Sequence, residues 1–244
     1  NLGQGEPQTD ALKNAPQRPH KIELKPNDLG YGPLGGSLEL RSPIAAMYNR
    51  IYRKGKTSQY GPENVSIASG GRLVLSRLFN IFGDNATILY RTPDYTAYED
   101  LLAYQRLHTR LVCAATTQEE SFRFSSERFK NAIENEHVNA FVFSNPHNPT
   151  GTVIQDEELN NYVRLAREHN VFLAIDEFYS HYIYKKNGEA SNAPVSAARY
   201  IEDVEKDPVI LIDGATKNLR CPGLRISWAV GPSVIIESIN RVAS

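Results

Sequence analysis

Lys217 and Asp176 each combine a reactive side chain with a position at the end of an apolar segment. Lys217 follows the apolar run 209–212, and a lysine at a strand end, in a pocket that lowers its pKa, can form a Schiff base with a carbonyl carbon. Asp176 ends the apolar run 171–175, where a carboxylate can keep a pyridinium nitrogen protonated. Each residue also has a plainer interpretation, because most lysines are solvated and an aspartate often caps the next helix. The surrounding elements have to decide between these interpretations.

Short apolar runs typical of β-strands alternate along the chain with longer amphipathic segments. The predicted strands are residues 65–69, 86–91, 109–113, 138–144, 171–176, 209–213 and 225–231. The amphipathic segments include residues 37–54, 73–82 and 156–169, and they carry helix start and stop signals. This alternation predicts an α/β fold: a mostly parallel seven-stranded sheet with helices on both faces.

Ligands of a parallel sheet bind beyond the carboxyl ends of its strands. Four of the predicted strands are followed by glycine, amide, charged or aromatic residues. These are Gly70-Gly71-Arg72, Asn145-Pro146-His147-Asn148-Pro149-Thr150-Gly151, Asp176-Glu177-Phe178-Tyr179 and Thr216-Lys217. Because these strand ends share one edge of the sheet, the edge is the predicted ligand site.

The charge balance excludes a strong attraction to nucleic acid or anionic lipid. The 244 residues include 27 Lys and Arg against 28 Asp and Glu, which gives a formal net charge of −1. No apolar run approaches the roughly eighteen residues of a bilayer span, and the first twenty residues lack the apolar core of a signal peptide. We therefore expect a cytoplasmic protein without a nucleic-acid or membrane partner.

Three further patterns predict no site. Cys113 and Cys221 have neither metal-binding nor redox spacing, and the six histidines include no H-x-x-x-H pair, so no metal is expected. Residues 30–35 match the dinucleotide pattern G-x-G-x-x-G, but no strand precedes them and no acidic residue lies near twenty positions later.

The order and spacing of the motifs resemble the class I and II aminotransferase family, which are fold type I pyridoxal-phosphate-dependent enzymes. The resemblance rests on Asn145-Pro146-x-Asn148-Pro149-Thr150-Gly151, Asp176-x-x-Tyr179, Lys217 and Gly223-x-Arg225. Supporting matches are Leu2-Gly3-Gln4-Gly5-Glu6-Pro7, Tyr31-Gly32-Pro33-Leu34-Gly35 and Pro93-Asp94-Tyr95. It spans Gly5 to Gly231, nearly the whole chain.

The resemblance implies a role for each residue near the cofactor ring. Lys217 would be the internal aldimine lysine and then the general base of the 1,3-proton shift, while Asp176 would hold the pyridinium proton. Asn148 and Tyr179 would donate hydrogen bonds to the phenolate oxygen, and Asn148 would also contact the substrate. Tyr95 would stack on the ring face, although a tyrosine of the core is the alternative.

The resemblance also implies a phosphate site and a dimer. Arg225 would bind the phosphate together with the main-chain N–H groups of Gly70 and Gly71 at a helix N-terminus. Tyr31 is similar to a tyrosine that crosses the dimer interface to the partner's phosphate, so a homodimer with shared active sites is expected. Gly5 is similar to a glycine whose main chain faces the substrate carboxylate.

Two positions depart from the family pattern at the phosphate. Family members usually carry Ser or Thr where this chain has Arg72, and Ser where it has Gly214. Two hydroxyl donors are thus lost and one guanidinium is gained. We expect Arg72 to compensate by binding the phosphate, with an outward-pointing Arg72 as the alternative.

By the same resemblance, residues 31–244 form the cofactor-binding large domain. Residues 1–30 form an extended lead-in that belongs to the small domain or a linker. In the family, a C-terminal small domain follows and supplies an arginine for the substrate α-carboxylate. This sequence begins without a methionine and ends before that domain. We therefore expect the C-terminal small domain to be absent from a truncated, partial or degenerate chain.

The implied function is that of an aminotransferase, which moves an amino group from an amino acid to a 2-oxo acid through a Lys217 aldimine. A lyase or a cyclising synthase on the same fold would share Lys217, Asp176 and Tyr179, so the sequence does not separate these activities. A truncated or inactive homologue that binds a ligand is a further alternative. A regulator of this fold would carry a helix-turn-helix segment, and the region before Gly5 contains none.

Overall fold

The computed structural model describes residues 5–8, 10, 18–185, 188, 191 and 193–243, with only the main chain of Asn27. Leu2, Gly3 and Gln4 of the predicted N-terminal motif lie outside these residues. Among the described residues, no helix has the length and apolar character needed to cross a membrane.

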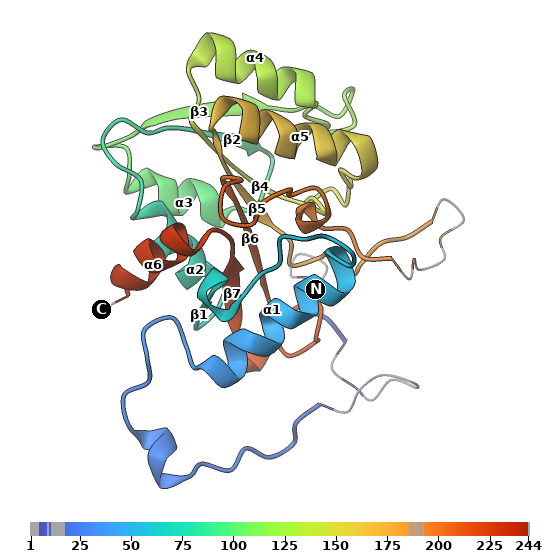
Figure 1. Cartoon of the computed structure of the whole chain (residues 1–244). Helices are drawn as coiled ribbons and strands as arrows, with labels where there is room; N and C mark the ends of the chain where they lie inside the picture. Colours follow the sequence, from blue (N-terminus) through green and yellow to red (C-terminus); the bar gives the residue numbers. More distant parts are fainter. Residues whose placement is uncertain are drawn as a thin grey trace.

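A seven-stranded sheet forms the centre of the molecule (Figure 1). Its strands are β1 (Val65–Ala68), β2 (Thr87–Thr92), β3 (Arg110–Ala115), β4 (Ala140–Ser144), β5 (Phe172–Asp176), β6 (Val209–Gly214) and β7 (Ser227–Val230). The strand order is β1-β7-β6-β5-β4-β2-β3. Strand β7 runs antiparallel to both neighbours, and the other pairs are parallel. The predicted mostly parallel α/β sheet is confirmed, and each strand overlaps its predicted range.

The helices connect these strands. They are α1 (Leu38–Tyr52), α2 (Gly71–Phe79), α3 (Ala97–Ala103), α4 (Ser126–Glu136), α5 (Asp156–His169) and α6 (Ser233–Arg241). Short 3₁₀ turns are η1 (Pro26–Leu29), η2 (Pro62–Asn64), η3 (Ala197–Arg199) and η4 (Pro222–Leu224). Helix α5 has the predicted bounds, because acidic residues fill its first turn and Asn170 takes the left-handed conformation after its last. Helix α2 begins two residues earlier than predicted, since the positive φ of Gly70 already turns the chain into it.

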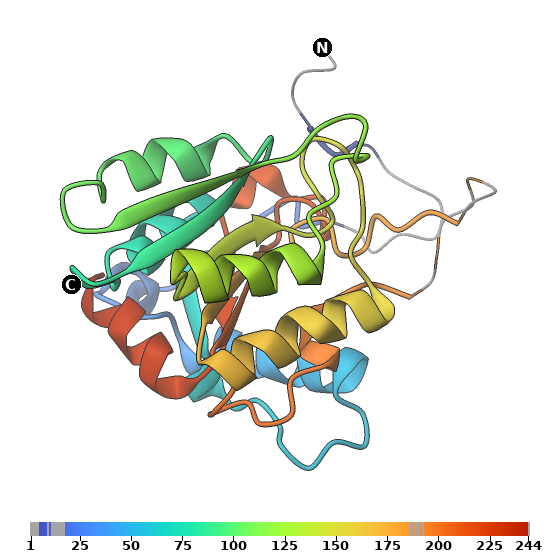
Figure 2. The ribbon, with the colours of Figure 1, turned by 90° about the horizontal axis from the view of Figure 1, so that it is seen from above.

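Two buried clusters cover the two faces of the sheet. One packs the sheet against α1, α4 and α5, and the other packs it against α2, α3 and α6. Figures 1 and 2 show α4 and α5 side by side on their face. Because side chains alternate along a strand, neighbouring residues such as Asp176 and Glu177 face different layers. As a result, the side chain of Asp176 points away from the buried cluster on the other face of the sheet.

The N-terminal segment, residues 18–37, forms a wide loop away from the sheet (Figure 1). It carries large apolar side chains that are exposed in the single chain: Ile22, Leu24, Leu29 and Tyr31. Exposed apolar side chains gathered on one segment are typical of a surface that another molecule or segment covers.

Candidate active site

The carboxyl ends of the central strands bring the predicted motifs to one edge. Ser144 pairs with Asp176 across β4 and β5, and Asp176 pairs with Ile212 across β5 and β6. Strand β7 is antiparallel, so its amino end lies at this same edge, where Ser227 pairs with Gly214. Arg225 comes just before β7, whereas the other candidate residues come at or after the end of a strand. Because β7 is antiparallel to β6, Arg225 nevertheless lies at the same edge of the sheet.

Lys217, Tyr179 and Gly5 meet at this edge. The ammonium group of Lys217 donates a hydrogen bond to the main-chain oxygen of Gly5 and lies 5.5 Å from the centre of the Tyr179 ring. A Cβ atom on Gly5 would stand 2.7 Å from the Tyr179 hydroxyl, so only a glycine fits there without a shift. Burial lowers the pKa of Lys217, while the carboxylate of Glu6 opposes this change. The amine is therefore less basic than that of a solvated lysine.

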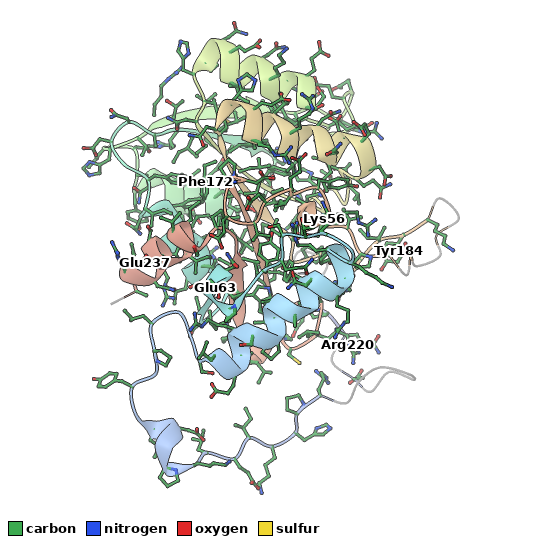
Figure 3. All side chains as sticks on the ribbon, viewed as in Figure 1. Lys56, Glu63, Phe172, Tyr184, Arg220 and Glu237 are labelled. Carbon is green, nitrogen blue, oxygen red and sulfur yellow. The ribbon has the colours of Figure 1, made fainter. Side chains whose placement is uncertain are left out.

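Arg220 contacts residues that follow Gly5 in the chain, beside Lys217. Its guanidinium donates to the main-chain oxygens of Gln8 at 3.3 Å and Asp10 at 3.4 Å. Arg220 is one of the residues labelled in Figure 3. Contacts from both Arg220 and Lys217 thus keep the stretch that begins at Gly5 against the site.

Asp176 lies buried at the end of β5 with two hydrogen-bond donors. The Tyr98 hydroxyl donates to its Oδ2 at 3.1 Å, and the main-chain N–H of Phe178 donates to its Oδ1 at 3.3 Å. Burial raises the pKa of Asp176 to about 7, although both hydrogen bonds oppose the change. In the described part of the chain this carboxylate has no salt-bridge partner, so a cationic ligand group would stabilise its charged form.

Gly70, Gly71 and Arg225 lie together at the N-terminus of α2, and we call this group the phosphate cradle after the role predicted for it. Gly70 has a φ of +96°, and a Cβ atom there would collide with the Arg225 guanidinium. A Cβ atom on Gly71 would lie 2.8 Å from the Phe178 ring. The first N–H groups of a helix have no partner within the helix, so they can bind an anion together with the guanidinium.

Arg72 turns toward Tyr95. Its guanidinium lies 6.0 Å from the centre of the Tyr95 ring, and hydrogen bonding to Tyr95 raises the pKa of Arg72. The Tyr95 ring itself packs edge-on against Tyr98, with 5.7 Å between the ring centres. Arg72 is thus exposed to solvent, and its guanidinium lies over the Tyr95 ring.

The sequence analysis missed Ser227, which lies opposite Gly214. The Ser227 hydroxyl is buried and has no hydrogen-bond partner among the described residues. A Cβ atom on Gly214 would stand 2.6 Å from this hydroxyl oxygen and 2.7 Å from the main-chain oxygen of Ile226. This chain thus has glycine at position 214, where the family usually has serine, and the hydroxyl of Ser227 on the neighbouring strand lies beside that glycine.

Two buried carboxyl groups on the α1 face were also missed. Glu177 accepts a hydrogen bond from the N–H of Ala197 at 2.8 Å, and burial raises its pKa to about 8. Asp213 accepts from the side-chain amide of Asn218 at 3.0 and 2.9 Å, and burial raises its pKa as well. Because Asn218 follows Lys217 directly, Asp213 anchors the main chain that carries the lysine.

Asn148 and Tyr31 have different surroundings. Asn148 is half-buried in the loop after β4, and its main-chain N–H donates to the Ser144 hydroxyl at 2.9 Å. Tyr31 is fully exposed on the N-terminal segment. The geometry of the single chain thus gives Asn148 a place at the edge of the sheet and leaves Tyr31 free for an external contact.

The donor set of this edge fits pyridoxal phosphate. An amine with a lowered pKa can bind an aldehyde covalently, and the buried carboxylate of Asp176 can pair with a pyridinium. The phosphate cradle can hold the phosphate group. These three groups lie on neighbouring elements of one sheet edge, which is the arrangement that a small phosphorylated aromatic aldehyde requires.

Comparisons with known proteins give a consistent result. The chain matches the family described as "Aminotransferase class I and II" over residues 1–244. It is 29% identical over 247 residues to an aspartate aminotransferase of Bacillus subtilis (strain 168), covering 100% of this chain and 58% of that protein. It is 30% identical over 246 residues to an aspartate/prephenate aminotransferase of Thermus thermophilus, covering 100% and 59%.

The solved structure of an aspartate aminotransferase from Thermus thermophilus with maleate is similar in fold. The TM-score is 0.74 at 29% sequence identity, and the match covers 88% of this chain and 52% of that one. The chain thus spans 58–59% of the length of the two curated relatives named above.

Proposed function

The chain belongs to the class I and II aminotransferase family, and we propose that it acts as a pyridoxal-phosphate-dependent aminotransferase. It would move an amino group from an amino acid to a 2-oxo acid. The observation that carries the proposal is that Lys217, Asp176 and the phosphate cradle lie at the same edge of the sheet. Family members use pyridoxal phosphate, and the donor set of this edge fits it.

When bound, pyridoxal phosphate withdraws electrons from the reacting carbon of an amino acid through its protonated ring nitrogen. Asp176 would keep the proton on that nitrogen. Its burial makes an unpaired charge costly, and a cationic ring nitrogen would offset this cost, so the two groups would stabilise each other's charged forms. Tyr98 and the N–H of Phe178 orient the carboxylate for this contact.

Lys217 would hold the cofactor covalently and then carry a proton at its Nζ atom. The lowered pKa of Lys217 favours the neutral amine, which is the form that attacks a carbonyl and accepts a proton. Its present acceptor is the Gly5 oxygen, so Lys217 has to leave this hydrogen bond when it acts. The Gly5 main chain then remains beside the reacting atoms, where it would face the substrate carboxylate.

The remaining roles complete the cofactor site. Tyr179 and Asn148 would donate to the phenolate oxygen, and Tyr95 would stack on the ring. The proximity of Tyr179 to Lys217 supports its role. Arg72 would assist the phosphate cradle, since its position in the first turn of α2 brings it near the N–H groups there.

We also propose a homodimer in the cytoplasm, with Tyr31 reaching the partner's phosphate. The exposed apolar side chains of residues 18–37 support a partner surface, because they would otherwise face water. In this proposal, residues 1–30 are the lead-in and residues 31–244 are the large domain.

An absorbance experiment tests the proposed activity. The purified protein is loaded with pyridoxal phosphate and mixed with a panel of amino acids that includes aspartate, because the names of both relatives above include aspartate. We expect the band of the covalently held cofactor to bleach with an amino acid and to return with a 2-oxo acid. Loss of the band without return on addition of 2-oxo acid would favour a lyase or synthase, and a band that never responds would favour an inactive homologue.

Reduction with borohydride tests the role of Lys217 separately. Peptide mapping should place the reduced cofactor on Lys217. Lys56 is the matched control, because it is also partly buried with a lowered pKa, but it binds the main-chain oxygen of Ile201 away from the edge. An adduct at Lys56 would contradict the assignment.

A further inference from the structure

Beneath Tyr95 and Asn148 lies a buried polar cluster that consists of Arg91, Asp94, Ser144 and His147. Arg91 comes from β2 and Asp94 from the loop that follows it, and their side chains are only 2% and 1% exposed. The guanidinium Nε donates to Asp94 Oδ2 at 2.6 Å. A buried ion pair of this kind is costly unless the other polar atoms around it are also satisfied.

The carboxylate of Asp94 links two loops that follow different strands. Its Oδ1 accepts a hydrogen bond from the N–H of Tyr95 at 2.7 Å and another from the Ser144 hydroxyl at 2.5 Å. The hydroxyl oxygen of Ser144 in turn accepts a hydrogen bond from the main-chain N–H of Asn148 at 2.9 Å. A continuous path of hydrogen bonds therefore runs from Tyr95 through Asp94 and Ser144 to Asn148.

Arg91 and His147 close the cluster from its other sides. Arg91 donates from Nη2 to the main-chain oxygen of Ser144 at 2.5 Å, so it binds both loops at once. His147 Nε2 lies 2.8 Å from the Pro93 oxygen, and its Nδ1 lies 2.5 Å from the Thr150 hydroxyl. Because a carbonyl oxygen only accepts, Nε2 carries the proton and Nδ1 accepts from Thr150. The ring is thereby a second link between the two loops.

We propose that Asp94 is a positioning residue that fixes the Tyr95 segment against the Asn148 segment. The inference rests on the proposed function for what these two residues do, namely stacking on the cofactor ring and donating to its phenolate oxygen. Strands β2 and β4 are parallel neighbours, but nothing in strand pairing alone sets the distance between the loops beyond their ends. The fully hydrogen-bonded carboxylate sets this distance, because moving either loop leaves a buried charge with fewer donors.

The first test needs no cofactor. Both oxygens of Asp94 accept hydrogen bonds, so in Asp94→Asn the amide NH₂ has to face a donor. Hydrogen exchange of the cofactor-free protein should become about tenfold faster in residues 95–98 and in residues 144–151 together, the scale of one lost hydrogen bond to a charged group. Faster exchange confined to residues 95–98 would overturn the proposal, because it would show that the two loops are not coupled.

Asp207→Asn is the matched control. Asp207 is also buried, with 2% of its side chain exposed, and it pairs with Arg167 through two contacts of 2.9 Å. It lies before β6, at the opposite edge of the sheet. This variant should lower stability but leave exchange in residues 144–151 unchanged. An equal rise there in the control would show that general destabilisation, not positioning, is measured.

The single variant leaves the Arg91 guanidinium buried without its partner, which can prevent folding. The double variant Arg91→Met, Asp94→Asn removes the pair together and keeps the test valid. We expect the double variant to fold and still to exchange faster in residues 144–151, since the path to Asn148 is broken. Wild-type exchange in that segment of the folded double variant would contradict the proposal.

A second readout uses the loaded protein. A donor on the phenolate oxygen lowers the pKa of the covalently held cofactor, so a displaced Asn148 should raise the pH midpoint of the absorbance change. We expect a shift to higher pH in Asp94→Asn and none in Asp207→Asn. If Asp94→Asn has faster hydrogen exchange but the wild-type pH midpoint, the proposed effect of Asp94 on the cofactor site is overturned. If the wild-type protein binds no cofactor, the proposed function fails, while the exchange experiment still decides the coupling.

Discussion

Tyr98 donates a hydrogen bond from its hydroxyl to Asp176 Oδ2 at 3.1 Å, and both side chains are buried. Tyr98 belongs to α3 and Asp176 ends β5, so the contact ties a helix of one layer to the strand end that carries the carboxylate. The Tyr98 ring also packs edge-on against Tyr95. Tyr98 thus orients the carboxylate that is proposed to contact the ring nitrogen, and it supports the side chain that is proposed to stack on the ring.

Asp176→Asn should leave cofactor binding nearly intact but reduce turnover by on the order of 10²-fold or more. An amide does not hold the ring nitrogen protonated, while the phosphate cradle is unchanged. Cofactor titration and steady-state kinetics measure the two effects. Tyr98→Phe is the control, because it keeps the carboxylate, and its loss of turnover should be much smaller. Near-normal turnover in Asp176→Asn would show that Asp176 only caps the chain that follows.

Tyr31→Phe should weaken cofactor binding about tenfold, the scale of one hydrogen bond to a charged group. The wild-type protein should sediment as a dimer at low micromolar concentration, because Tyr31 is proposed to act on the partner's phosphate. Tyr104→Phe, at another exposed tyrosine, should change nothing. A monomer with full cofactor occupancy would refute the shared site.

Arg72→Ala should weaken cofactor binding by about 1.5–3 kcal/mol, the range of a hydrogen bond to a charged group. The expectation depends on the guanidinium turning from the Tyr95 ring to the phosphate, which is proposed to bind at the same helix terminus. Arg199→Ala, at an exposed arginine of η3, is the control. Equal dissociation constants for wild type and Arg72→Ala would assign Arg72 to the Tyr95 contact alone.

Glu177→Gln should flatten the pH dependence of the unfolding free energy in the cofactor-free protein. Burial raises the pKa of Glu177 from 4.5 to about 8. Its contribution is therefore fully present below pH 4.5 and is lost as the pH rises to about 8. In this window one such carboxyl lowers the unfolding free energy by up to about 1.4 kcal/mol per pH unit.

Urea unfolding at a series of pH values measures the slope. Asp176 and Asp213 also have raised pKa values, so the slope should decrease in Glu177→Gln without vanishing. The exposed Glu237 provides the control variant Glu237→Gln, whose slope should equal that of the wild type. A wild-type slope in Glu177→Gln would mean that Glu177 does not titrate in this window.

Gly214→Ala should destabilise the protein by about 1–3 kcal/mol through overpacking. The added Cβ atom would lie 2.7 Å from the main-chain oxygen of Ile226, which belongs to a paired segment and cannot move easily. Gly83→Ala is the control, because nothing lies within 4 Å of a Cβ atom there. Equal melting temperatures for the two variants would contradict this packing. The same contact means that a serine at position 214 cannot restore a phosphate donor without this cost.

Local patterns in the sequence were sufficient to predict the seven strands and the helices α1, α2 and α5. The acidic first turn and the terminal Asn170 predicted the bounds of α5, since both signals act within a few residues. Apolar runs predicted the seven strands, because strands of a mostly parallel sheet covered by helices on both faces are rich in apolar residues. The start of α2 was wrong by two residues, because a helix that begins with glycine has no capping side chain to mark it.

The sequence by itself determined the strands, the principal helices and the candidates Lys217 and Asp176, because periodicity and motif spacing are properties of neighbouring residues. Only the tertiary structure decided that β7 runs antiparallel and so brings Arg225 to the edge of Lys217. It also decided that Tyr98 meets Asp176 and that Asp94 meets Ser144. These partners come from different strands and helices, and their contacts depend on strand order and on the face to which each side chain points, which no local pattern encodes.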